Sequence, residues 1–506
     1  MKKRSWGLIL SYTNTLLSMV CGLFLSSFLL RKLGDTEYGI YQTMASFANY
    51  LVLLEFGAGT IMSRNIVACR TKINSDLETE KNISTIWTIT NILSVVIVFV
   101  SVIFYFLLDI IYGKSMSIEE ISHGKQMFIF IVIFLVVSFY SQTLNGVALA
   151  FEDYTFSSKN NIIKLLTRTV LIVSIILNFK NAIVIVIVDA AVGLLIALYS
   201  YFYCIRKYRV RINFRNFDKG ILRTSMPLCI AIFLQGVINQ ANSNVGKFIL
   251  GIKIGPEEVA LYSVALYIYG VFSSVSTIPV SLYVPQVTKD VVRGLQGKEL
   301  TKTLVQPSRL IAIVGGTIVG GFIAAGKPFI SIVYGAEYSL AWYLAIIIMV
   351  PMFVYSTTAI CLNVLDAKNK RIGCSVLLMI TTAFNVLLTL ILSEKFNIIG
   401  VAVATGISTL IGQVVLLGLY YHRTVKISVL YLLFNSYKGI LIYQLVAAVL
   451  GYIISVVVQN QYLAFALAGI TYVVVSFGGF LLLGKNETEN KMICQIVNKV
   501  KSKEKL

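Results

Sequence analysis

Apolar residues run along this chain in long blocks that short polar stretches separate. Each block approaches or exceeds the about 20 residues that an α-helix needs to cross the hydrocarbon core of a bilayer. The pattern predicts an all-α polytopic membrane protein with about 14 transmembrane helices. The predicted spans are residues 7–30, 38–62, 83–108, 124–150, 161–178, 181–204, 220–250, 257–285, 304–326, 338–362, 372–393, 397–421, 438–458 and 461–484.

Composition supports this class. Of the 506 residues, 57% are hydrophobic and only 13% are charged, against about 25% charged residues in ordinary globular proteins. The stretches between the predicted helices are too short for a soluble catalytic domain. Only two His occur, and the seven Cys are scattered without a C-x-x-C pair. We therefore expect no metal, redox site or other cofactor.

The net charge of +20 is a topology signal. With the N-terminus in the cytoplasm, most of the 43 Lys and Arg residues fall on the inner side, as the positive-inside rule requires. The densest basic block lies between residues 206 and 223. Such a distribution favours contact with anionic membrane lipids and not with nucleic acid.

A short repeat suggests a duplication. Residues 32–41 and 253–262 share Lys, Gly, Glu and Tyr at equivalent positions, each after the first helix of a group of six. Parallel repeats of this kind are typical of transporters that rock two lobes about a central site. The expected parts are a first six-helix lobe over 1–206, a basic cytoplasmic linker over 207–219, a second six-helix lobe over 220–421, two further helices within 422–484 and a basic cytoplasmic tail over 485–506.

A polar run late in the seventh predicted helix is the main candidate site. It contains Asn239, Gln240, Asn242, Asn244 and Lys247 at spacings that place them on or beside one helix face. A diphosphate-linked sugar needs a cation for its charge and amides for its hydroxyls. The alternative is that Lys247 extends its ammonium to the membrane interface.

Four other charged residues are candidates, each with a structural alternative. Glu55 is expected to pair with a cation such as Lys247, to be protonated in a transport cycle, or to cross-link packed helices. Asp189 stands alone in an apolar run, which makes it a functional candidate by its cost in the membrane. Arg31 ends the first helix near the expected cavity mouth, and Arg64 closes the second helix where an incoming diphosphate would arrive; interface anchoring also explains both.

Three segments of the chain resemble a known family. The run Leu33-Gly34-x-x-Glu37-Tyr38-Gly39-Ile40-Tyr41, the run Leu54-Glu55-Phe56-Gly57-Ala58-Gly59 leading to Arg64, and Asn244-x-x-Lys247-Phe-Ile-Leu-Gly251 are similar to polysaccharide repeat-unit flippases of the Wzx type. That family often has Asp where Glu55 and Asn244 stand here. The second departure weakens the case for carboxylate-dependent ion coupling at Asn244.

The resemblance implies the fold of the multidrug/oligosaccharidyl-lipid/polysaccharide exporter superfamily. It implies a flippase, not an enzyme, that moves an undecaprenyl-diphosphate-linked oligosaccharide to the outer leaflet of a bacterial plasma membrane by alternating access, for O-antigen or capsule assembly. The implied partners are the lipid-linked oligosaccharide, membrane lipids, an H⁺ or Na⁺ gradient, and the polysaccharide polymerase with its chain-length machinery.

Two other functions stay open from the sequence. A multidrug exporter of the same fold would need an acid-lined cavity for cationic drugs, and few carboxylates lie within the predicted spans. A membrane-embedded polysaccharide polymerase would need an acid/base cluster near the interface, for which the outer loop 109–123 offers only Asp109, Glu119, Glu120 and His123. Nucleotide binding is excluded, because Pro328 follows the G-x-x-x-x-G-K match where Ser or Thr would hold Mg²⁺.

Overall fold

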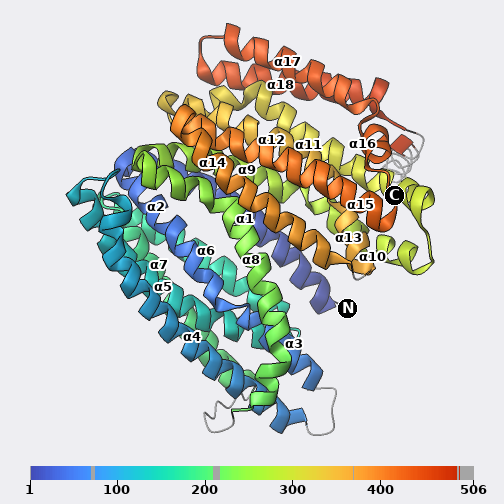
Figure 1. Ribbon diagram of the computed structural model, residues 1–506. Helices are drawn as coiled ribbons and strands as arrows, with labels where there is room; N and C mark the ends of the chain where they lie inside the picture. The colour runs from blue at the N-terminus through green and yellow to red at the C-terminus, as the bar shows by residue number, and fades with distance from the viewer. Residues whose placement is uncertain (1, 70–74, 209–216, 369, 487–488, 491–506) are drawn as a thin grey trace, which may run out of the picture. The chain divides into compact units, whose positions relative to one another are not determined.

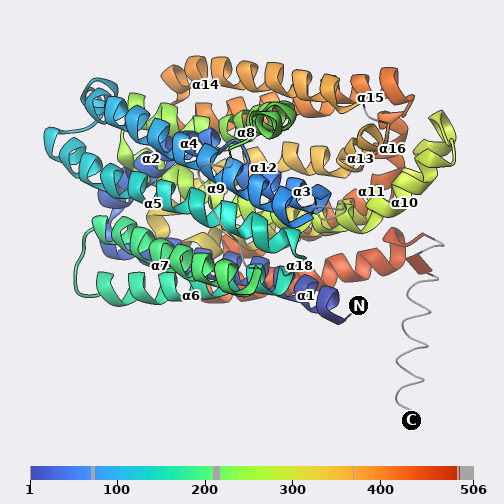
Figure 2. The ribbon, with the colours of Figure 1, turned by 90° about the horizontal axis from the view of Figure 1, so that it is seen from below.

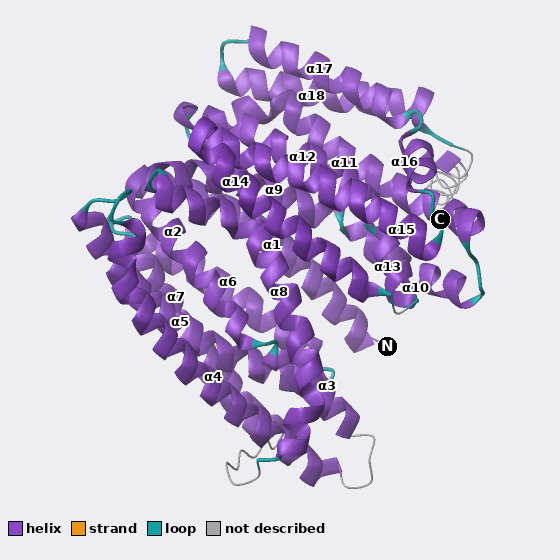
Figure 3. Ribbon diagram, in the orientation of Figure 1, coloured by secondary structure: helices purple, strands orange, loops and turns teal. Residues whose placement is uncertain are grey.

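The chain is helical throughout the part that the structure covers. The computed structural model describes residues 2–69, 75–208, 217–368, 370–486 and 489–490, without the side chains of 2–9, 11–12, 75–77, 231, 242–243 and 281–282. Among these residues every regular element is a helix and no strand occurs (Figure 3). The prediction of an all-α protein is confirmed. The chain packs as two compact units, Met1–Val264 and Ala265–Leu506.

The first unit holds the helices that carry the candidate residues. They are α1 (Lys2–Leu33), α2 (Asp35–Leu51), the 3₁₀ helix η1 (Val52–Glu55), α3 (Ala58–Cys69), α4 (Ser75–Tyr112), α5 (Ile118–Ala150), α6 (Tyr154–Ile176), α7 (Ile183–Tyr208) and α8 (Lys219–Lys253). The next helix, α9 (Pro256–Ser276), begins in this unit and continues into the second.

Helix packing in the first unit is centred on α5. It contacts α3, α4 and α7, while α1 packs on α6 and α8 packs on α2 and α4. Figures 1 and 2 show α4, α5 and α7 side by side. Where α3 crosses α5, a Cβ atom on Gly146 would overlap the carbonyl group of Gly59. Small residues allow this close approach of two backbones, which replaces the hydrophobic effect as a source of packing energy in lipid.

The second predicted span, 38–62, is interrupted in the structure. The helix ends at η1, Phe56 and Gly57 adopt left-handed φ angles of 49° and 71°, and α3 starts at Ala58. Glycine accepts this conformation at little cost, and a Cβ atom on Gly57 would come within 2.7 Å of the Ile232 side chain. The apolar pattern continues across the break, so hydrophobic periodicity alone predicts one helix.

The second unit continues from α9 with helices of varied length. They are α10 (Ile278–Val292), α11 (Gly297–Val333), η2 (Ala336–Ser339), α12 (Leu340–Thr358), α13 (Ile360–Ala367), α14 (Arg371–Ser408), the π-helix η3 (Thr409–Leu416), α15 (Leu417–Val425), α16 (Val429–Tyr437), α17 (Ile440–Val457), α18 (Gln461–Gly479) and the π-helix η4 (Phe480–Gly484). The last two α-helices form a pair that packs on α11 (Figure 1).

A buried arginine holds this pair to α11. Arg309 is only 4% exposed. Its Nε donates to Glu489 Oε1 at 2.7 Å, its Nη1 donates to the carbonyl oxygen of Lys438 at 2.7 Å, and its Nη2 donates to the carbonyl oxygen of Gly484. The guanidinium therefore joins the start of α17 and the end of α18 to one turn of α11.

The predicted number of spans agrees with the helices once two features are considered. Twelve segments of the described chain are long and apolar enough to cross a membrane. One of them, Arg371–Val425, contains a non-helical break at Asn397 and so holds two predicted spans. A further helix, α6, coincides with the predicted span 161–178 but is not among the twelve; it carries Lys164 and Arg168.

The packing units differ in extent from the predicted lobes. The repeat assigns α8 to the second lobe, whereas α8 packs within the first unit. Compactness and sequence duplication are different properties, so the lobe boundaries stay a prediction. Most of the predicted linker and tail, 209–216, 487–488 and 491–506, lies outside the described residues.

Candidate functional site

Lys247 is held by an amide and a phenol. Its Nζ donates to Gln42 Oε1 at 3.2 Å, and Gln42 Nε2 donates to the Tyr38 hydroxyl at 2.8 Å. The side chain of Lys247 is half-buried, and no described carboxylate forms an ion pair with it. Lys247 lies six residues before the end of α8, a distance of about 9 Å along the helix. We call Lys247, Gln42 and Tyr38 the lysine group.

The amides predicted beside Lys247 divide by exposure. Gln240 is half-buried and Asn244 is buried. Gln240 lies four residues before Asn244, and Asn244 lies three residues before Lys247, so the three share a helix face. Asn239 is exposed and accepts a hydrogen bond from Gln235 at 3.2 Å. The side chain of Asn242 lies outside the described residues. The face formed by Gln240, Asn244 and Lys247 therefore combines a cation with two amides.

Asp189 is not isolated in the fold. Arg168 on α6 contacts both of its carboxylate oxygens: Nε donates to Oδ1, and Nη2 donates to Oδ2 at 3.0 Å. The hydroxyl of Tyr41 on α2 lies close enough to Arg168 to interact with its charge. Asp189 and Arg168 stand at comparable distances from the turn that joins α6 to α7, which is the signal that could have paired them from the sequence.

The lysine group and the Arg168–Asp189 pair meet at neighbouring residues of α2. Tyr41 contacts the pair and Gln42 contacts Lys247. Sequence reasoning identified Lys247 and Asp189 but missed Tyr41, Gln42 and Arg168 as their partners. The α2 turn from Tyr38 to Gln42 is therefore where cations from α6 and α8 converge.

The Leu33–Tyr41 motif builds this turn. Gly34 has a φ angle of 83° and ends α1 before α2 begins. Glu37 accepts from His123 Nδ1 at 3.0 Å and from the amide of Ala182 at 3.3 Å. A Cβ atom on Gly39 would overlap the backbone of Pro256. The motif residues thus fix α2 against α5, α7 and the start of α9.

Glu55 lies at the helix break and not beside Lys247. It borders a largely apolar cavity of about 220 Å³ between α3, α4 and α8, with no hydrogen bond or ion pair to another described residue. Lys247 contacts Gln42, thirteen residues before Glu55, and thirteen residues span about 20 Å of helix. The expected pairing of Glu55 with Lys247 is therefore absent from this structure.

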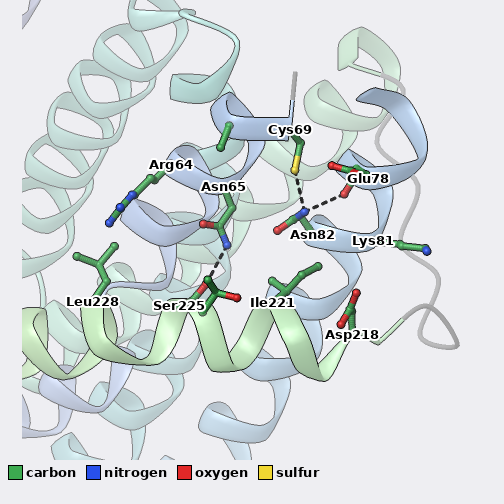
Figure 4. A pocket seen from close by; sticks show the side chains of 12 residues that line it. Arg64, Asn65, Cys69, Glu78, Lys81, Asn82, Asp218, Ile221, Ser225 and Leu228 are labelled. Atoms are coloured by element: carbon green, nitrogen blue, oxygen red, sulfur yellow. Dashed lines mark hydrogen bonds between the residues drawn. The ribbon is translucent and has the colours of Figure 1, made fainter. Parts of the chain in front are cut away.

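Arg64 lines a separate polar cavity of about 420 Å³ at the ends of α3, α4 and α8 (Figure 4). Inside it, Asn65 donates to Ser225 at 3.0 Å, and Asn82 donates to the carbonyl oxygen of Glu78 at 2.9 Å. Figure 4 shows the Arg64 and Lys81 side chains pointing away from each other at opposite ends. Arg64 is exposed and makes no hydrogen bond or ion pair within the described chain.

Arg31 differs from these residues in its surroundings. It is exposed in the last turn of α1, and so is Lys32. This exposure fits both of the predicted roles, a cavity mouth or an interface anchor. The structure therefore brings together Lys247, Gln240 and Asn244 on one face, and it places Asp189, Glu55, Arg64 and Arg31 in four other surroundings.

A family model for polysaccharide biosynthesis proteins matches residues 3–289. The match covers more than half of the chain and includes every candidate residue described above. The chain belongs to the polysaccharide biosynthesis protein family. No curated protein matches it by sequence.

Several solved structures of other proteins have a fold similar to that of this chain. A structure titled lipid II flippase MurJ, inward closed conformation, is 18% identical, with a TM-score of 0.73 over 94% of this chain and 100% of that one. An inward-facing multidrug resistance MATE family transporter of the MOP superfamily is 13% identical, with a TM-score of 0.62 over 82% and 95% of the two chains. The MATE multidrug transporter DinF-BH has a TM-score of 0.58 at 14% identity over 84% and 96%. The exporter-superfamily fold implied by the sequence motifs is confirmed.

Proposed function

We propose that this polysaccharide biosynthesis protein is a flippase for a polyprenyl-diphosphate-linked oligosaccharide, the repeat unit of a polysaccharide such as O-antigen or capsule. It would move the headgroup from the cytoplasmic to the outer leaflet of a bacterial plasma membrane by alternating access, with both termini in the cytoplasm. The family and the MurJ-like and MATE-like fold support a transporter and give no support to a catalytic role.

The observation that carries the proposal is the lysine group. A lysine at this depth normally pairs with a carboxylate because an uncompensated charge is costly in a membrane. Lys247 instead contacts the neutral oxygen of Gln42, so its charge stays available to an anionic ligand. Gln240 and Asn244 on the same face supply donors and acceptors for sugar hydroxyls.

Arg64 and Lys247 suggest the order of contacts. Arg64 stands near the cytoplasmic end of α3 in the predicted orientation, and Lys247 near the outer end of α8. The diphosphate would meet Arg64 on entry and Lys247 before release. Since the sequence lacks an ATP-binding motif, an H⁺ or Na⁺ gradient, or consumption of the product by a polymerase, would drive the cycle.

Reconstitution tests the proposal directly. Proteoliposomes would contain a polyprenyl-diphosphate oligosaccharide, and an impermeant sugar-modifying reagent would report its exposure with and without an H⁺ or Na⁺ gradient. We expect protein-dependent exposure that Lys247→Gln lowers about tenfold or more, since a hydrogen bond to a charged group contributes about 1.5–3 kcal/mol. Lys247→Arg, which keeps the charge, should retain most of it. Full exposure with Lys247→Gln at normal abundance would remove Lys247 from the mechanism.

One observation favours a second function, export of cationic small molecules. Glu55 presents a carboxylate without a protein partner to an apolar cavity, a combination that suits an apolar cation. The same proteoliposomes, loaded with a cationic dye, distinguish the two. Dye efflux that depends on Glu55, with no exposure of the lipid-linked sugar, would favour the multidrug function.

A further inference from the structure

A groove on the first unit runs between α4 and α5, away from every residue assigned above to transport. Its volume is about 510 Å³, and its walls are almost entirely hydrocarbon. Val98, Val102 and Phe106 line it from α4, and Ile129 and Ile133 line it from α5. The groove lies between two antiparallel helices that are predicted to span the membrane. Apart from Tyr105, the hydroxyl of Ser101 is the polar group that its wall offers to a ligand.

A charged pair stands at one end of this groove. Lys125 Nζ lies 2.6 Å from Asp109 Oδ2 and 5.1 Å from the centre of the Tyr105 ring, which is itself part of the groove wall. The side chain of Asp109 is 58% exposed, whereas that of Lys125 is 18% exposed. Both residues lie near the turn that joins α4 to α5. In the predicted orientation the pair is therefore at the outer membrane interface, and the groove extends from it toward the bilayer centre.

We infer that the groove binds one acyl chain of a glycerophospholipid whose headgroup carries both a phosphate and an ammonium group. The phosphate would interact with Lys125 and the ammonium with Asp109. A headgroup with only a negative charge would meet the exposed carboxylate, and local charge complementarity therefore selects the zwitterion. In the predicted orientation this lipid belongs to the outer leaflet.

The site is independent of the proposed function. No residue of the lysine group, the Arg168–Asp189 pair or the Arg64 cavity lines the groove. Lipid binding can therefore be measured without a transport substrate, and failure of either proposal leaves the other standing.

Photolabelling tests the inference in nanodiscs that contain the full chain. The probe is a phosphatidylethanolamine with a diazirine on its acyl chain, and peptide mass spectrometry locates the label. We expect label at residues 98–106 and 128–137 in excess of that at the exposed apolar positions Leu387 and Ile391 of α14. Unlabelled phosphatidylethanolamine should compete better than phosphatidylglycerol by about two- to fivefold, the range for an exposed charge pair.

Variants separate the groove from the headgroup contacts. Val102→Trp fills the groove and should remove its label while leaving that on α14. Asp109→Asn should abolish the preference for phosphatidylethanolamine, whereas Glu119→Gln, an exposed acid near the same turn, should not. Thermal unfolding checks that each variant is folded. Equal labelling of the groove and α14, or equal competition by both lipids in the wild type, would overturn the inference.

Discussion

Gln42 determines how Lys247 is presented. The amide oxygen orients the ammonium group at 3.2 Å without neutralising it, and the Tyr38 hydroxyl fixes the amide in turn. A carboxylate at the same place would hold Lys247 more strongly, because it would add the attraction of opposite charges to the hydrogen bond. The choice of an amide therefore favours ligand binding over stability.

Gln42→Glu tests this role. The variant supplies Lys247 with an ion-pair partner of nearly the same shape, so we expect sugar exposure in proteoliposomes to fall by about tenfold while the unfolding temperature stays the same or rises. Gln235→Glu is a matched control on α8, about 18 Å along the helix from Lys247. Unchanged exposure with Gln42→Glu would show that the free charge of Lys247 is not required.

Asp189 differs from Lys247 because it has an oppositely charged partner. Both of its carboxylate oxygens accept hydrogen bonds from Arg168. Removing one member of a buried ion pair leaves an uncompensated charge and costs about 3–5 kcal/mol. The Arg168–Asp189 pair is only partly buried, with 26% and 13% of the two side chains exposed. We therefore expect Asp189→Leu to lower stability by somewhat less than that amount, and Arg168→Met with Asp189→Leu to recover most of the loss. Thermal unfolding in detergent measures both. A double variant that is stable but inactive would instead assign the Arg168–Asp189 pair a direct role in transport.

At the scale of elements, one carboxylate secures the junction between α5, α6 and α7. Asp153 caps α6 by accepting from the amide of Phe156 at 3.2 Å, and its Oδ2 accepts from Lys207, Tyr208 and Tyr203 at 2.5, 2.7 and 2.9 Å. Burial acts to raise the pKa of Asp153, but the hydrogen bonds from Lys207, Tyr208 and Tyr203 and from the amide outweigh it and lower the pKa to about 2.

This pKa shift has a defined consequence for stability. Because the folded pKa lies below the ordinary value, Asp153 stabilises the fold fully above about pH 4, and the contribution is lost as the pH falls through 2. We expect Asp153→Asn to lower the free energy of unfolding by about 2 kcal/mol near neutral pH and to flatten its pH dependence between 4 and 2. Unfolding curves over this range provide the measurement, with the exposed Glu299→Gln as control. If the free energy of unfolding of Asp153→Asn falls between pH 4 and 2 as steeply as that of the wild type, other groups cause the fall.

The helical elements themselves follow from the sequence more closely than their interruptions do. Long apolar blocks predict the spans because a bilayer fixes the length of helix that it accepts. The break at Phe56 and Gly57 leaves the apolar pattern intact, and Gly57 packs against Ile232 of α8, far along the chain. Interruptions of this kind are tertiary features, so periodicity does not reveal them.

At the scale of the whole molecule, the sequence predicts which residues are functional candidates better than it predicts the residues that they contact. Lys247 and Asp189 stand out because charge is rare in apolar blocks, but Gln42 lies 205 positions from Lys247. A single sequence contains no record of such a contact. The contact between Asp189 and Arg168 could have been predicted from the sequence. Consecutive antiparallel helices place residues side by side when these are equally far from the turn that joins the helices.

The contacts of Arg309 set an order on the biosynthesis of the second unit. Its partners Lys438, Gly484 and Glu489 lie 129, 175 and 180 residues further along the chain. At about 5–20 residues per second, a ribosome takes roughly 10 to 35 s to add the last of them. During that interval the guanidinium lacks these acceptors. Segments synthesised long after α11 therefore supply the acceptors for its arginine. Until they arrive, we expect water, lipid headgroups or the insertion machinery to surround that charge.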